Sequence, residues 1–541
     1  MKGLIKTGII FLAVLFNAGG YFVAAKTHPP DINTNPEAAL AFWGEVIRLD
    51  PGDAVAFNNR GKAYKNMGRY QTAVENYNEA IRLDHDNAEA YYNRGIAYKE
   101  LGEHHRAIDD FSQAILLEPD NAEAYRHRGT TFKKLGQYHQ AIENYDRAIT
   151  LEPDNFKAYN NRGVALKNLG QYQQAIDDYN RAIRLNPESS IVYNNRGVAY
   201  KNLGQYELAI QDIDQAIHMD PKNPDAYNNR GNALSKTGQY FRAIEDYGRA
   251  IELNPTEAWT FNNRGVAYKM LGEYNRAVED YNRAIQLNPD NAEIYFNRGI
   301  AYKNLGKLQR AVVDYDQAVH LDPTNAVFYR HRGVAYRKLG QYQHAIEDFN
   351  QAIQLKQDYA KAYYNRGVAY KILGQYKRAI QDYDQAIRIK ENDAQMYNSR
   401  GVAYKNLGRL RKALTDFNTA IRLVPDNADF YTNRGNLYKN FGQFQLALQD
   451  YGQAILLNPG DAETYYSRGI VYRNTGQPQK AMADFDQAIR LDPKYAEAYI
   501  NRGIGHINTG KYDLACVDFE KACELGDCAH LTLAKKNEDC P

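Results

Sequence analysis

Amide and basic side chains recur at one fixed spacing, and they are the groups best suited to binding a ligand. A primary amide both donates and accepts hydrogen bonds, so a column of amides can pair with the backbone of an extended peptide. A basic column beside it would favour acidic side chains or a free carboxylate, and salt would weaken that preference. The asparagines, spaced by multiples of 34 residues, are Asn59, Asn93, Asn161, Asn195, Asn229, Asn263, Asn297, Asn365, Asn433 and Asn501. The basic residues, six positions after the same points of the period, are Lys65, Lys99, Lys133, Lys167, Lys201, Lys269, Lys303, Arg337, Lys371, Lys405, Lys439 and Arg473.

The alternative interpretation of both columns is a solvated helix surface that was copied together with the period. Two aromatic residues interrupt the polar pattern, Trp259 and Phe296. Aromatic side chains on a polar surface can anchor a partner's side chain, although Trp259 could equally fold back onto its own helices. Arg126-His127 and Arg330-His331 replace the usual residues at two further points. They are either subsites for acidic groups or ordinary surface variation.

All four cysteines lie near the C-terminus, at Cys516, Cys523, Cys528 and Cys540. An even count in an exported chain predicts disulfides. If a terminal helix runs back antiparallel to the one before it, Cys540 returns close to Cys516 and leaves Cys523 beside Cys528. A metal site that uses these cysteines with His530 is the alternative, but the spacing fits no common zinc motif.

No catalytic motif accompanies these residues. The sequence lacks a glycine-rich phosphate loop, a nucleophile elbow and paired histidines at zinc-protease spacing. We therefore expect a protein that is not an enzyme, with no cofactor and no catalytic metal. The 67 basic and 65 acidic residues leave a formal charge of only +2. Nucleic-acid binders usually carry a clustered basic excess, so we expect no binding to nucleic acid.

One repeat positions all of these side chains. Arg-Gly pairs recur from Arg60-Gly61 to Arg502-Gly503 at 34-residue spacing, without an insertion or deletion. Counting each repeat from the seventh residue before this glycine gives fourteen repeats over residues 54–529. Position 4 is always aromatic, positions 8 and 15 are always glycine, and positions 20 and 27 are always alanine. This pattern predicts two amphipathic helices per repeat, with the glycine at position 15 ending the first helix. We expect alanine to pack opposite the glycine at position 8.

The chain closely resembles the tetratricopeptide repeat family over these residues. The resemblance implies an all-α fold, a right-handed α-α superhelix whose concave face consists mainly of first helices. The asparagine column then falls at position 6 and the basic column at position 12, both on that inner face. Position 7 departs from the family, because arginine stands where leucine is usual. Position 23 is aspartate in twelve repeats and asparagine at Asn76 and Asn144. The matching columns predict structural arginine–aspartate ion pairs with bidentate geometry.

The ends of an open solenoid need caps. Residues 36–53 match a lone second helix, residues 26–35 form a linker, and residues 530–541 form a capping helix and tail. Residues 1–25 have a basic start, an apolar stretch and Val23-Ala24-Ala25, as in a cleaved export signal. An uncleaved membrane anchor is the alternative. Either one predicts an exported chain, periplasmic or extracellular, that contacts the membrane only through this segment.

These expectations combine into one functional hypothesis. The chain is predicted to be a protein-interaction scaffold that holds an extended, acidic polypeptide in its concave groove. The alternative is a structural or assembly protein of an envelope complex, which would use the convex face or the ends of the solenoid.

Overall fold

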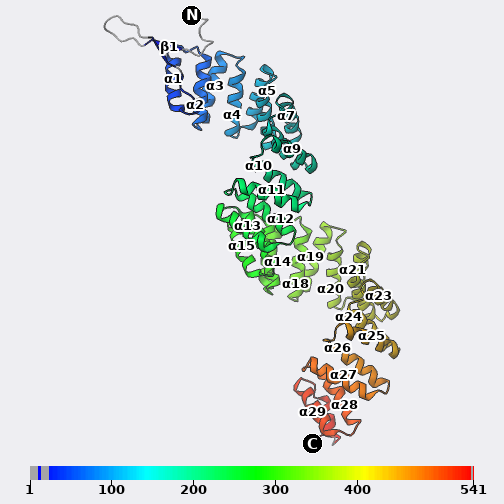
Figure 1. Cartoon of the computed structure of the whole chain (residues 1–541). Coiled ribbons are helices and arrows are strands. Elements are labelled where there is room, and N and C mark those ends of the chain that lie inside the picture. Colours follow the sequence, from blue (N-terminus) through cyan, green and yellow to red (C-terminus); the bar gives the residue numbers. More distant parts are fainter. Residues whose placement is uncertain (1–9, 14–23, 28, 538–539, 541) are drawn as a thin grey trace. The chain divides into compact units, whose positions relative to one another are not determined.

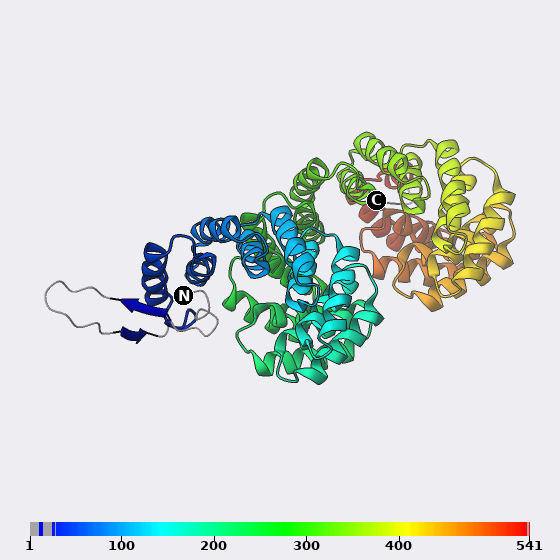
Figure 2. The same cartoon turned by 90° about the horizontal axis from the view of Figure 1, so that it is seen from above.

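The computed structural model describes residues 10–13, 24–27, 29–537 and 540. By internal packing the chain divides into two compact units, Met1–Gly272 and Glu273–Pro541. Within each unit, helices follow one another side by side in chain order (Figure 1, Figure 2). The all-α solenoid class expected from the repeat is confirmed.

The first unit alternates the first and second helices of each repeat. It opens with α1 (Pro36–Leu49), a helix without a first-helix partner. The first helices are α2 (Ala54–Asn66), α4 (Ala88–Glu100), α6 (Ala122–Lys134), α8 (Phe156–Asn168), α10 (Ser190–Asn202), α12 (Pro224–Lys236) and α14 (Ala258–Met270). The second helices are α3 (Tyr70–Leu83), α5 (His104–Leu117), α7 (Tyr138–Leu151), α9 (Tyr172–Leu185), α11 (Tyr206–Met219) and α13 (Tyr240–Leu253).

The second unit continues the same alternation and begins with a second helix. Its first helices are α16 (Ala292–Asn304), α18 (Ala326–Lys338), α20 (Ala360–Ile372), α22 (Ala394–Asn406), α24 (Ala428–Asn440), α26 (Ala462–Asn474) and α28 (Ala496–Ile507). Its second helices are α15 (Tyr274–Leu287), α17 (Leu308–Leu321), α19 (Tyr342–Leu355), α21 (Tyr376–Ile389), α23 (Leu410–Leu423), α25 (Phe444–Leu457), α27 (Pro478–Leu491) and α29 (Tyr512–Glu524), and α30 (Ala529–Lys536) closes the unit.

Local chemistry fixes where the helices begin and end. At the start of α4 the side chain of Asn87 accepts a hydrogen bond from the backbone of Ala90 at 2.9 Å, which satisfies one of the free amides at a helix N-terminus. At its end Gly102 takes a φ of +82°, a conformation that a side chain would resist. The same left-handed glycine ends the first helix in every described repeat from Gly68 to Gly510.

The close approach of the two helices in a repeat depends on the glycine at position 8. A Cβ atom built on Gly163 would lie 2.7 Å from the ring of Tyr179, and one on Gly299 would lie 2.7 Å from the ring of Tyr315. The sequence predicts alanine opposite this glycine, but the nearest side chain is a different one, so that prediction is wrong. A side chain at position 24 of the second helix fills the space. It is Ile213 in one repeat and an aromatic ring in the others, and these rings are among the largest fully buried side chains.

Arginine at position 7 bonds to two other helices at once. Arg298 donates to both carboxylate oxygens of Asp314 in its own repeat, at 2.9 and 2.6 Å, and to Asn282 in the preceding repeat at 2.7 Å. Where position 23 is asparagine, as at Asn144, the arginine makes one bond to it. The predicted arginine–aspartate pairs are confirmed, and the bond to the preceding repeat is an addition that the sequence analysis did not foresee.

The ends of the chain carry other elements. Two short strands, β1 (Ile10–Ala13) and β2 (Ala24–Thr27), pair antiparallel with Ile10 opposite Thr27; the sequence analysis expected no strand there. The rest of the predicted signal or anchor segment lies outside the described residues. Among the described residues, no helix is both long enough and apolar enough to cross a bilayer.

Two disulfides hold the C-terminal end together. Cys516 of α29 is bonded to Cys540, with their Cα atoms 5.5 Å apart, and Cys523 is bonded to Cys528, with their Cα atoms 4.0 Å apart. The first bond ties the tail to a buried cluster that includes Phe519. No cluster of three or more potential metal-ligand side chains occurs in the part of the chain that the structure describes.

The ring-against-glycine contact predicts opposite effects for two glycine substitutions in the second unit. Gly299→Ala should lower the free energy of unfolding by about 1–3 kcal/mol, because the new methyl group overpacks against Tyr315. Gly452→Ala, in α25 with nothing within 4 Å of the new Cβ, should raise it by up to about 1 kcal/mol through helix propensity. Denaturant unfolding followed by circular dichroism measures both. Equal shifts in the two variants would show that the ring contact is not tight.

The arginine bridge predicts a graded response at its aspartate. Asp314→Ala strands a half-buried guanidinium on Arg298 and should lower local stability by about 3 kcal/mol. Asp314→Asn should cost less, because Asn76 and Asn144 naturally accept from Arg60 and Arg128. Amide hydrogen exchange in α16 and α17 reports the change. A smaller loss for alanine than for asparagine would contradict a structural role for the pair.

Candidate peptide-binding groove

Within each unit the first helices form the more closely packed side of the stack. Each first helix from α2 to α12, and likewise from α18 to α24, contacts the next first helix of its unit as well as its own partner. The second helices of successive repeats make no comparable contact in the described parts of the chain. Side chains at one position of successive first helices are therefore neighbours, and the two columns become continuous features of each unit.

The asparagine column lies at the seam between repeats. Asn93, Asn297 and Asn501 are buried, and the other seven members are half-buried. Several of these amides donate to position 5 of the preceding repeat: Asn195 to Asn160 at 3.0 Å, Asn229 to Asn194 at 3.2 Å, Asn263 to Asn228 at 3.2 Å and Asn433 to Asn398 at 3.1 Å. Part of the hydrogen-bonding capacity expected to be free for a ligand thus serves the stack itself.

The position-5 partners were missed by the sequence analysis. Their signal is a partial one: at several seams asparagine faces asparagine, whereas Tyr92 faces His127 with ring centres 5.7 Å apart and Phe296 faces His331 with ring centres 4.9 Å apart. The match is incomplete, because Tyr466 faces Asn501. Position 6 thus contacts the neighbouring repeat as well as the first-helix face.

The basic column lies directly beside the asparagine column. Lys65 donates to the side-chain oxygen of Asn93 at 2.9 Å, and Lys133 donates to that of Asn161 at 3.3 Å. Arg473 makes the equivalent bond to Asn501. All twelve basic residues are half-buried except Arg473, which is exposed. The structure therefore brings the two predicted columns together at these three seams.

The electrostatics of the basic column are unusual. Burial lowers the pKa of eight of its ammonium groups, which form no ion pair in the described residues: Lys65, Lys133, Lys167, Lys201, Lys303, Lys371, Lys405 and Lys439. Repulsion from Lys167 and Lys236 lowers the pKa of Lys201 further. Attraction to Glu89 partly offsets the lowered pKa of Lys65, and attraction to Glu463 does so for Lys405 and Lys439. Where no such carboxylate acts, as at Lys167 and Lys201, a partly desolvated cation is costly to the free protein.

The predicted aromatic anchors occupy different environments. Trp259 on α14 is 41% exposed in the first unit. Phe296 on α16 is half-buried in the second unit and packs on Phe328 with ring centres 4.8 Å apart. Trp259 is thus accessible to a partner, whereas Phe296 presents only part of its ring.

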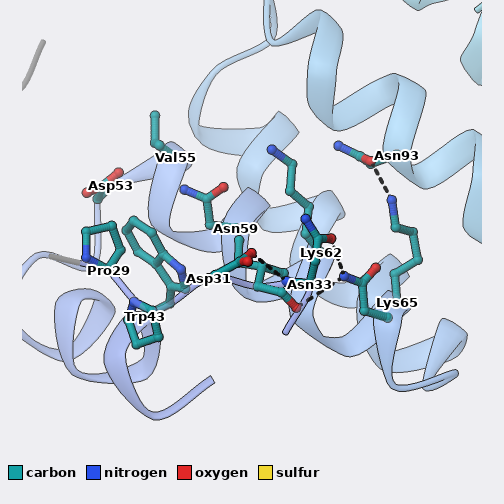
Figure 3. Close-up of a pocket in the computed structure, with 13 residues that line it drawn as sticks. Pro29, Asp31, Asn33, Trp43, Asp53, Val55, Asn59, Lys62, Lys65 and Asn93 are labelled. Carbon is teal, nitrogen blue, oxygen red and sulfur yellow. Dashed lines mark hydrogen bonds between the residues drawn. The ribbon is translucent and has the colours of Figure 1, made fainter. Parts of the chain in front are cut away.

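The linker before the first repeat contacts the first helix of that repeat. The side chain of Asn66 donates to the backbone oxygen of Ile32 at 3.2 Å and to the side-chain oxygen of Asn33 at 3.1 Å. Asn33 and Asp31 of the linker line a cavity of about 590 Å³ together with Asn59, Lys62 and Lys65 (Figure 3). An inner-face amide therefore binds the backbone of a non-helical segment in this structure.

Stacked helix pairs with a polar inner face define a helical-repeat scaffold. The chain belongs to the tetratricopeptide repeat family. Profiles described as "TPR repeat" match residues 64–102, 129–170, 231–272, 267–306, 333–372 and 406–442. Profiles described as "Tetratricopeptide repeat" match residues 42–75, 88–121, 156–189, 190–223, 213–245, 292–325, 360–393, 428–461, 462–495 and 496–525.

Solved structures with this fold are similar over much of the chain. The Cut9–Hcn1 assembly of the APC/C is 17% identical and covers 87% of this chain and 93% of its own, with a TM-score of 0.40. Yeast Tom70 is 18% identical, covers 78% and 95%, and has a TM-score of 0.37. YrrB, described as a TPR protein with an unusual peptide-binding site, is 26% identical, covers 34% and 95%, and has a TM-score of 0.31. No curated protein matches the sequence.

The uncompensated column predicts that removing one of its charges stabilises the fold. Lys201→Met keeps the length of the side chain and removes a desolvated ammonium, so it should raise the free energy of unfolding by up to about 1 kcal/mol. Lys222→Met, at an exposed loop position, should change it by less than about 0.5 kcal/mol. Denaturant midpoints measure both changes. A clear loss of stability in Lys201→Met would mean that this lysine has an internal structural role.

Proposed function

We propose that the chain is an exported scaffold that binds an extended acidic polypeptide along its first-helix face. The tetratricopeptide fold is that of a protein-interaction scaffold, and the proposal adds the location of the site and the charge of the ligand. The observation that carries it is the basic column, a row of half-buried ammonium groups with lowered pKa and no carboxylate within ion-pair distance in the described residues.

Ligand carboxylates would supply the missing counter-charge. An ionised acceptor on an ammonium group forms a short, strong hydrogen bond, and at a partly desolvated lysine the attraction is screened less than in water. The amides beside the column contribute the second element. They would bind backbone groups of the ligand, as Asn66, an amide at position 13 of the first repeat, binds the backbone oxygen of Ile32 within this chain. Together the two columns would bind charge and backbone at each repeat, in a multivalent mode.

Export is the second part of the proposal. The N-terminal residues have the composition of an export signal or anchor, and two disulfides are placed at the C-terminal end. Structural disulfides persist in oxidising compartments. Both observations support a periplasmic or extracellular location.

The alternative role, an assembly protein that uses its outer face, receives less support. Some exposed apolar side chains on the second helices, such as Leu116 on α5 and Phe241 on α13, stand far apart in the sequence, whereas Leu514 and Val517 on α29 stand close together. Scattered single apolar residues are ordinary on protein surfaces.

The proposal predicts that binding depends on where positive charge is removed. Lys167→Met with Lys201→Met should weaken binding of a labelled glutamate-rich peptide by roughly tenfold, from the loss of two charge-assisted contacts. Arg184→Met with Lys222→Met removes the same net charge from exposed sites of the same unit and should have little effect. Fluorescence anisotropy at constant salt measures both.

The same titration has a defined pH dependence. A bound carboxylate raises the pKa of the lysines, so binding is linked to proton uptake, and affinity should fall as the pH rises through their lowered pKa in the free protein.

Equal weakening in the two double variants would mean that only net charge matters and would reject the groove as the binding site.

A further inference from the structure

Two places in the chain share an arginine-histidine pair that follows an aromatic residue one repeat earlier. In the first junction, Arg126 and His127 of α6 follow Tyr92 of α4. In the second junction, Arg330 and His331 of α18 follow Phe296 of α16. The histidine rings pack alike, His127 against Tyr92 and Phe111 and His331 against Phe296 and Tyr315. The two junctions are therefore built on one plan, each inside a single unit.

The junctions differ in what neutralises the arginine. In the first junction, Arg126 donates to both oxygens of Glu123, at 2.8 Å for the Nε–Oε1 pair, and this bond lowers the pKa of Glu123 to about 2. In the second junction, Val327 occupies the position of Glu123. Arg330 donates to the hydroxyl of Tyr359 and contacts His331, and no carboxylate lies within ion-pair distance of it in the part of the chain that the structure describes.

The neighbouring lysine of the basic column repeats this difference. Beside the first junction, Lys99 lies 2.9 Å from Glu100, the next residue in the chain. Beside the second junction, Lys303 is followed by Asn304 and has no carboxylate partner among the described residues. Burial lowers the pKa of Lys303, and repulsion from Lys338 and Arg330 lowers it further. The first junction is thus internally neutralised, whereas the second holds two cations that lack an anion.

A cavity beside the second junction indicates which kind of ligand side chain could lie next to a bound anion. Its volume is about 560 Å³, and Phe296, Val327 and Phe328 contribute apolar walls. Asp290, Glu293 and Asp322 also line it, so a second acidic group would be repelled there. Phe296, Val327 and Phe328 give this otherwise polar cavity an apolar surface, on which an apolar side chain of a ligand could pack.

We propose that the second junction is a specificity subsite for one acidic residue of the ligand, with a carboxylate or phosphoryl oxygen bound between Arg330 and Lys303 and the neighbouring apolar side chain in the cavity beside Phe296. The inference rests on the proposed binding of an extended acidic polypeptide and adds the position at which one acid is selected. Arginine suits either oxyanion, because its planar donors match both geometries.

The first junction supplies the design of the test. Val327→Glu introduces the carboxylate that Arg126 already has in Glu123, so Arg330 should become neutralised from within its own helix. Val327→Gln adds the same bulk without the charge and is the matched control. The probes are labelled peptides that are identical except for one central residue, glutamate, phosphoserine or glutamine, beside an apolar residue.

In the full-length chain, Val327→Glu should weaken binding of the glutamate and phosphoserine peptides about tenfold relative to Val327→Gln, the loss expected for one charge-assisted contact. The glutamine peptide should bind the two variants equally. A larger penalty for phosphoserine than for glutamate would identify a phosphoryl group as the preferred ligand, and the reverse would identify a carboxylate. Circular dichroism melts establish that both variants are folded.

The converse variant strengthens the test. Glu123→Val removes the internal anion of the first junction and should increase affinity for the acidic peptides several-fold. If Val327→Glu and Val327→Gln bind the acidic peptides equally, the subsite is overturned while the wider groove proposal stands. If the wild-type chain binds the glutamate, phosphoserine and glutamine peptides equally, a preference for acidic ligands is itself wrong and both proposals fail.

Discussion

The arginine at position 7 is the interaction on which the stack depends. Arg196 shows the arrangement: two bonds to Asp212 hold the second helix of its own repeat, and one bond to Asn180 holds the second helix of the repeat before. A planar guanidinium fixes all three directions at once. The aspartate is buried, so a shifted register would leave charges unpaired in a low-dielectric seam. An arginine of this kind therefore fixes both the pairing within a repeat and the step to the preceding one, whereas Arg468, which follows Gly452 at the accepting position, bonds among the described residues only within its own repeat.

A constant step between repeats places residues that are one period apart on the same face of the stack. Because the first helices of successive repeats touch one another in each unit, side chains 34 residues apart become neighbours on one face. Any residue copied with the repeat then forms a column, and like charges in a column repel. The lysines show this consequence. In addition to burial, repulsion from Lys62 and Lys99 lowers the pKa of Lys65, and repulsion from Lys405 lowers the pKa of Lys439. Positive charge therefore collects in a partly buried column, where desolvation and mutual repulsion are unfavourable. An anionic ligand would reduce this electrostatic cost.

Much of this arrangement follows from the sequence and some of it does not. The period, the two helices per repeat and the arginine–aspartate pairs could be read from residue types, because each shows as a residue type repeated at fixed positions of the period. The bond from Asn195 to Asn160 and the contact of Tyr179 with Gly163 could not. They depend on the rise and rotation between helices, which residue spacing alone does not determine. The contact of Ile32 with Asn66 belongs to a segment outside the repeat, where no period constrains the chain.

Function in such a chain arises where copies differ. A column of identical cations binds any acidic chain in any register, so repetition alone gives affinity without selectivity. Carboxylates of the chain itself that pair with some of these cations make the positions of the column unequal. Glu100 and Glu123 each pair with a neighbouring cation at one seam, whereas Asn304 and Val327 leave the equivalent cations without a carboxylate partner at another. A ligand must place its acids where such carboxylates are absent. If the groove binds as proposed, selectivity comes from the few side chains that depart from the period, while the repeated residues supply the common frame.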